Sequence, residues 1–104
     1  MTFNRGEVWS VRGVEHPATI LHVEDHKTLG DIVHIGFLSP EAQLPMHMPF
    51  SKEALAASVV QMTGYTELGD ASSEGIEYWR RELQNSGAGI YSISVRDALF
   101  LVME

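Results

Sequence analysis

The chain has 104 residues, of which 44% are hydrophobic and 20% charged, a balance that is typical of one folded domain and excludes a disordered chain. Its net charge of −7, from 14 acidic and 7 basic side chains, repels phosphate backbones and so disfavours nucleic acid as a partner. The absence of cysteine excludes disulfides, thiolate nucleophiles and thiolate zinc sites, and no run approaches the ~20 apolar residues of a membrane span. We therefore expect a single cytoplasmic domain over residues 1–104 that enters no membrane and carries no cofactor.

The first third of the chain predicts three antiparallel strands. Apolar and polar residues alternate in Glu7–Arg12, as they do in a half-buried strand. A proline-containing turn follows, and then two more alternating runs, Thr19–Val23 and Ile32–Phe37. The polar segment between these runs contains glycine and aspartate, residues that favour turns, so the two runs are expected to pair as a β-hairpin.

The hairpin pattern also predicts which residues face each other. In the expected register Leu21 lies opposite Ile35, and His22 lies opposite His34. Because side chains alternate between the two faces of a strand, Leu21 belongs to the apolar face and Ile20 to the opposite face, together with the histidines.

The remainder of the chain predicts a loop, helices and one more strand. Three prolines indicate a long loop over Leu38–Phe50, after which the apolar spacing changes to that of a helix over Lys52–Met62. A linker follows, then a second helix over Glu74–Asn85, a fourth strand over Ile90–Ser94 and a third helix over Val95–Met103. The fold class is α+β: a small, largely antiparallel sheet in the order βββ-α-α-β-α, covered by two or three helices.

Two segments are candidate surfaces for a protein partner. The tail of the last helix, residues 98–103, is apolar on every side, which is typical of a helix that is buried or covered by another chain. A homodimer or a partner contact would cover it; alternatively, one side packs on the sheet and the others stay half exposed. In the predicted loop, flexible methionines beside an aromatic residue suit an adaptable contact surface, although they could equally fill the core. The candidate partner-binding residues are Met46, His47, Met48, Phe50, Leu99 and Phe100.

The histidines suggest a possible metal site. Facing each other across the hairpin, His22 and His34 would have Cβ atoms ~5 Å apart, close enough to share an ion with His47 as a third ligand. Glu24 or Asp31 could replace His47 in that role. The alternative is a histidine pair that faces solvent or is covered by a helix, and a covered pair should be neutral and hydrogen-bonded. The sequence contains no compact metal-ligand motif and no GxSxG or SxxK signature of nucleophilic catalysis.

The chain resembles a family of small uncharacterised bacterial proteins in four segments that cover most of its length. These are GDIVHI at 30–35, HMPFSKEAL at 47–55, GIEYWR at 75–80 and GIYSISV at 89–95. The resemblance implies a self-contained domain, and some proteins of this kind look like immunity or antitoxin partners.

A second resemblance covers the first third only. RGEVWSV at 5–11 and HPATILHV at 16–23 are similar to the opening of SH3-like-barrel mRNA-interferase toxins. That family carries a basic residue, which it uses on RNA, just before the proline that enters its second strand. Here His16 precedes Pro17, so the expected arginine is missing. The resemblance therefore implies a fold for the N-terminal strands rather than an activity on RNA.

These observations lead to a non-enzymatic bacterial binding protein as the main functional hypothesis. Its partner would be another protein, such as a basic toxin or effector that it neutralises, because an acidic surface steers towards a basic one. The alternative is a small metal-dependent hydrolase or ribonuclease that uses the histidine cluster. A third option is a homodimeric accessory protein.

Overall fold

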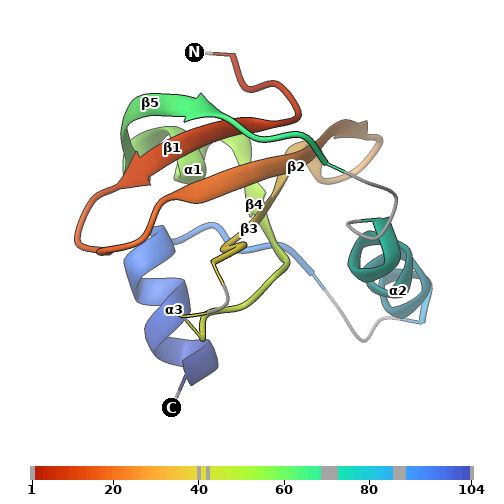
Figure 1. Ribbon diagram of the computed structural model, residues 1–104. Coiled ribbons are helices and arrows are strands. Elements are labelled where there is room, and N and C mark those ends of the chain that lie inside the picture. Colours follow the sequence, from red (N-terminus) through yellow and green to blue (C-terminus); the bar gives the residue numbers. More distant parts are fainter. Residues whose placement is uncertain (1, 40, 42, 69–72, 86–88, 104) are drawn as a thin grey trace.

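The fold is α+β, as predicted, and its described residues form a curled five-stranded antiparallel sheet and three helices (Figure 1). The computed structural model describes residues 2–39, 41, 43–68, 73–85 and 89–103. The elements in chain order are β1 (Glu7–Val11), β2 (Ala18–His26), β3 (Gly30–Gly36), β4 (Met48–Ser51), α1 (Lys52–Ser58), β5 (Val59–Tyr65), α2 (Ser73–Gln84) and α3 (Val95–Met103). Within the described part of the chain, no helix has the length and apolar character needed to cross a bilayer.

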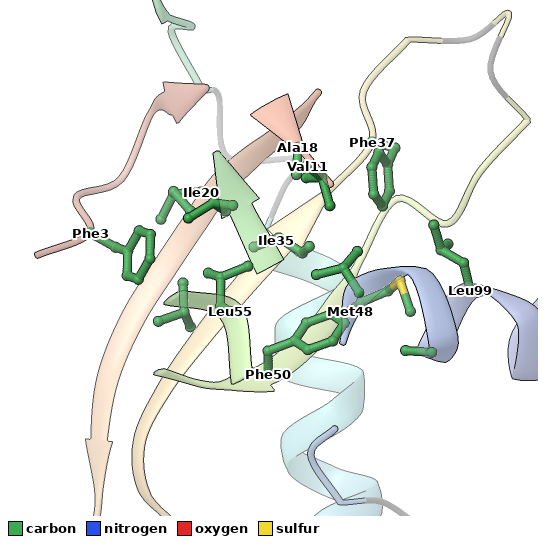
Figure 2. Close-up of a cluster of buried hydrophobic side chains, with 14 residues drawn as sticks. Phe3, Val11, Ala18, Ile20, Ile35, Phe37, Met48, Phe50, Leu55 and Leu99 are labelled. Carbon is green, nitrogen blue, oxygen red and sulfur yellow. The ribbon is translucent and has the colours of Figure 1, made fainter. Parts of the chain in front are cut away.

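The strands lie in the order β4-β3-β2-β1-β5, and every neighbouring pair is antiparallel. The short helix α1 connects β4 to β5, the two outermost strands, and its Leu55 is fully buried. Leu55 belongs to the main core cluster with Ile35 and Phe50, and Leu99 of α3 packs into the same cluster (Figure 2). The core therefore joins one face of the sheet to α1 and α3.

The hairpin of β2 and β3 confirms half of the predicted register. His22 lies opposite His34, as expected, but Ile20 rather than Leu21 lies opposite Ile35. The ladder is irregular between Ile20 and His22, which is the position of a β-bulge with Leu21 as its extra residue. The bulge moves Ile20 into the main core, and Leu21 is buried outside that cluster instead. Leu21 packs beside Gly36, where an added Cβ would lie 3.1 Å from Leu21 Cδ1.

The prediction of a helix over Lys52–Met62 is wrong beyond Ser58. Ser51 is the N-cap, as its sequence position suggests, because its hydroxyl accepts a hydrogen bond from the Ala54 N–H at 3.2 Å. The helix ends where Val59 adopts an extended conformation and begins β5, which pairs with β1. β-Branched valines favour a strand, and pairing with β1 outweighs the helical spacing of the apolar residues.

The predicted strand over Ile90–Ser94 is also wrong, since the structure has a single parallel bridge between Phe50 and Tyr91. Tyr91 forms two backbone hydrogen bonds there, one to the Pro49 carbonyl and one from the Ser51 N–H, both 2.9 Å long. The ladder goes no further because β4 ends at Ser51 and α1 begins at the next residue. Helices α2 and α3, by contrast, confirm the predictions within one residue at each end.

Candidate functional site

A row of hydrogen-bonded polar side chains lies on the face of β3 that points away from the main core. Its centre is His34, which is fully buried. His34 Nε2 is 2.8 Å from Glu24 Oε1, and His34 Nδ1 is 2.8 Å from His47 Nε2. The other oxygen of Glu24 accepts a hydrogen bond from Arg80 Nη2 at 2.7 Å. We call His47, His34, Glu24 and Arg80 the His34 network.

The hydrogen-bond partners assign the protons of the network at neutral pH. Ionised Glu24 can only accept, so His34 carries its proton on Nε2 and donates it to the carboxylate. Nδ1 of His34 is then an acceptor, and it receives the Nε2–H of His47. In this arrangement Nδ1 of His47 is the imidazole nitrogen of the network that keeps its lone pair. The buried imidazole thus has both of its nitrogens satisfied.

Electrostatics keep both histidines neutral and the carboxyl group charged. Burial is the largest cause that lowers the pKa of His34, and together with the charges of His22 and Arg80 it outweighs the hydrogen bond and the charge of Glu24, which raise that pKa. Burial, followed by the charge that His34 would carry, lowers the pKa of His47 to about 4. Burial raises the pKa of Glu24, but hydrogen bonds from His34 and Arg80 outweigh it and hold that pKa below its usual value.

The network lies where α2 packs against the sheet. The ring of Trp79 in α2 meets the His34 ring edge-on, with centroids 4.9 Å apart, and its Nε1–H donates to the Gly89 carbonyl at 2.8 Å. Gly75 of α2 adjoins His47 so closely that an added Cβ would lie 3.2 Å from His47 Cβ. Arg80 also comes from α2. The network therefore links the hairpin, the segment before β4 and α2.

The structure brings the three predicted metal ligands together without arranging them to hold an ion. The ring centroids of His22 and His34 are 5.8 Å apart, and His47 is hydrogen-bonded to His34. Both nitrogens of His34 are engaged, by Glu24 and by His47, so neither has a lone pair free for a shared ion. Among the residues that the structure describes, no group of three or more histidine or acidic side chains could hold a metal. Asp31 lies at the hairpin tip, opposite Asp25.

A second candidate surface is formed by the end of α3. Its last four residues (Phe100, Leu101, Val102 and Met103) are apolar and are between 44% and 66% exposed. Beside them is an apolar groove of about 390 Å³, lined by Gly13, Val14, Glu15, His16, Leu44, Arg96, Leu99, Phe100 and Met103. The guanidinium carbon of Arg96 lies 5.6 Å from the Phe100 ring centroid at this groove. We call the four residues and the groove the α3 surface.

The predicted partner-binding residues fall into two groups. Met46 and Phe100 are exposed, and His47 is half buried within the His34 network. Met48, Phe50 and Leu99 belong to the main core, which agrees with the alternatives in which the loop residues fill the core and one side of the last helix packs on the sheet. Pro49 and its neighbours form β4, which explains the difference: the end of the predicted loop is an edge strand of the sheet, and its residues are mostly buried.

Sequence reasoning missed Arg80 and Trp79 as members of the site. Trp79 shares a helix face with Ile76, a spacing typical of core residues, and both side chains are buried. Arg80 precedes Arg81 on α2 and carries no local signal that distinguishes the two. Only the docking of α2 brings Arg80 to Glu24.

No protein-family model matches the chain, and neither do any curated proteins or solved structures. The structure itself defines the class: an α+β domain with a curled five-stranded antiparallel sheet packed by three helices.

Proposed function

We propose that this protein is a non-enzymatic binding protein that recognises another protein through the α3 surface. The observation that carries the proposal is the run of four exposed apolar residues that ends α3. Soluble proteins seldom expose contiguous apolar patches unless the patch has a partner. The groove beside the run could receive an apolar side chain, which is how interface anchors gain most of their binding energy.

The net charge of −7 of the whole chain supports a basic partner. Long-range attraction would steer a basic protein towards the chain and raise the association rate, and the apolar anchors would then slow dissociation. This is the way an immunity protein or antitoxin neutralises a basic toxin or effector. The proposal sets this encounter in the cytoplasm.

The His34 network supports binding over the alternative of a metal-dependent hydrolase or ribonuclease. A histidine that activates a metal or a water needs a free nitrogen directed at it. Both nitrogens of His34 are hydrogen-bonded inside the protein, and Trp79 covers the ring. We assign the network the role of holding α2 on the sheet.

The experiment is affinity capture with the tagged protein in lysate of its source cell, at low and at high salt, followed by titration of the purified captured protein. The variants are Leu101→Asp on the α3 surface and Tyr78→Asp, at an equally exposed position on α2, as the matched control. We expect a basic protein that binds wild type and Tyr78→Asp alike and binds Leu101→Asp at least about tenfold more weakly, the loss typical of an interface anchor. Capture of no basic protein, or equal binding by both variants, would overturn the proposal.

A further inference from the structure

We propose that the outer edge of β5 pairs with β5 of a second copy of this chain. The two strands would run antiparallel across a two-fold axis near Met62, the middle residue of β5, and would join two five-stranded sheets into one. This inference concerns a different surface from the α3 surface and does not depend on the proposed function.

The position of β5 leaves one of its backbone edges available. β5 is an outermost strand, and across the described ranges its sheet partner is β1 alone (Figure 1). An outermost strand presents unpaired N–H and C=O groups along its outer side, which makes it a template for another strand. β5 is seven residues long, which is within the usual length of a paired strand.

The composition of β5 lacks the side chains that usually prevent such pairing. Its sequence, VVQMTGY, contains no charged residue and no proline. Val60, Met62 and Tyr65 are 58%, 41% and 71% exposed, respectively. An exposed, apolar, uncharged edge is a predicted site of strand addition, because charges and prolines are the common means of blocking an edge.

The irregularities of β5 are satisfied on its inner side. The ladder with β1 shifts twice, between Val8 and Trp9 and between Trp9 and Val11. At the second shift the Ser10 hydroxyl donates to the Gln61 carbonyl at 3.2 Å and accepts from the Gln61 N–H at 3.3 Å. These side-chain hydrogen bonds replace ladder bonds to β1, so the backbone N–H and C=O groups of Gln61 have partners on the inner side of β5.

The opposite edge of the sheet provides an internal comparison. β4 has four residues, includes Pro49 and is mostly buried. Its outer side is covered by the segment around Tyr91, through the hydrogen bonds to Pro49 and from Ser51. The fold thus protects one edge with its own chain, while β5 has no equivalent cover among the described residues.

Charge favours a second copy as the occupant. Each copy carries −7, so an interface between two copies must avoid placing acidic side chains opposite each other. β5 meets this condition because none of its seven residues is charged. A basic strand from another protein would find no carboxylate on β5 to recognise. Antiparallel pairing of identical strands also gives a closed two-fold dimer rather than an open chain of molecules.

Two measurements test the proposal: light scattering over a dilution series and crosslinking through a single introduced cysteine. The chain contains no cysteine of its own, so any disulfide must come from the introduced residue. We expect a wild-type dimer, a monomer for the double variant Val60→Lys/Met62→Lys, and a dimer for Leu101→Lys on α3. Mild oxidation should crosslink Met62→Cys into a covalent dimer, because directly opposed residues in a sheet lie within disulfide reach. Tyr78→Cys on α2 is the control and should form no covalent dimer, because Tyr78 lies outside the proposed interface.

Circular dichroism of the lysine double variant shows whether it is folded. If it is unfolded, the Met62→Cys crosslink alone decides. A wild-type monomer at every concentration overturns the proposal. So does a dimer that Leu101→Lys dissociates and the β5 variant does not, because the copies would then meet through α3. A 1:1 complex with another protein that only the β5 variant abolishes would assign the edge to that protein and would equally overturn it.

Discussion

Glu24 and Arg80 are separated by 56 positions in the chain, yet Arg80 Nη2 lies 2.7 Å from Glu24 Oε2. The same carboxylate accepts the buried Nε2–H of His34 with its other oxygen. One acidic side chain therefore connects a strand of the hairpin to α2 and also satisfies the most deeply buried polar group of the network.

The hydrogen bond of Glu24 to buried His34 should contribute more to stability than its ion pair with Arg80. Glu24→Ala leaves the buried His34 Nε2–H without an acceptor, and we expect a loss of about 1–3 kcal/mol in the free energy of unfolding. Arg80→Ala removes a half-exposed ion pair, which is worth less than about 1 kcal/mol. Urea denaturation of both variants, with Arg81→Ala as the control on the same helix, measures the difference. Equal losses for Glu24→Ala and Arg80→Ala would contradict this account.

Stability should fall as the pH is lowered from about 6.5 to about 4. The pKa of His47 is lowered from 6.5 to about 4 in the folded protein, and that of His34 is also lowered. The unfolded chain consequently binds more protons in this pH range, and mass action favours unfolding there. Thermal unfolding followed at several pH values from 7.5 to about 4 measures the effect, and we expect His47→Asn to show a shallower dependence. An identical slope for the variant would contradict it.

The proton positions can be checked directly. At pH 7 we expect His34 and His47 both to carry their proton on Nε2, because Glu24 can only accept. Two-bond ¹⁵N–¹H correlation spectra of the imidazole rings distinguish the tautomers. A proton on Nδ1 of His34 would mean that the order of donors and acceptors in the network is reversed.

Met46 and Met48, two positions apart, should differ widely in how much stability they lose when replaced by alanine. Met48 is 1% exposed and belongs to the core, so Met48→Ala should cost about 2–5 kcal/mol of stability. Met46 is 69% exposed, so Met46→Ala should change stability by less than about 0.5 kcal/mol. Denaturant unfolding of the two variants is the measurement. A large effect of Met46→Ala would indicate that this segment is packed differently.

Gly36 should not tolerate a side chain. An added Cβ there would lie 2.3 Å from the Met46 carbonyl oxygen, a backbone atom that cannot move without displacing the segment before β4. We expect Gly36→Ala to cost about 1–3 kcal/mol, as overpacking does. Gly64 has no atom within 4 Å of the same position, so Gly64→Ala is the control and should be close to neutral. Calorimetric unfolding of the two variants measures the loss. If Gly36→Ala were as stable as wild type, the Met46 carbonyl would not lie as close to Gly36 as the structure places it.

Local patterns were sufficient for the hairpin and for two helices. Period-two alternation predicts the pairing of His22 with His34, and amphipathic spacing predicts α2 and α3; the structure confirms all three. The bulge at Leu21 could not be predicted in this way, because a one-residue insertion keeps both strands intact and changes only which side chains meet.

Long-range pairing accounts for the remaining differences. Leu55, Val59 and Met62 have helical spacing, yet the chain becomes extended at Val59 because β1 offers a free edge to pair with. The His34 network depends in the same way on the docking of α2, which no local pattern records. The sequence pattern predicts that His22, His34 and Glu24 lie close together, but it does not indicate Arg80 or the contact of Trp79 with His34.

The return of β5 to β1 has a consequence for protein synthesis. Glu7 lies opposite Tyr65, so the second neighbour of β1 is translated long after β1 itself. At ~5–20 residues per second, the ribosome would need on the order of several seconds to supply it. During that interval the outer edge of β1 lacks its partner β5, and an unpaired edge is where non-native strand pairing can begin.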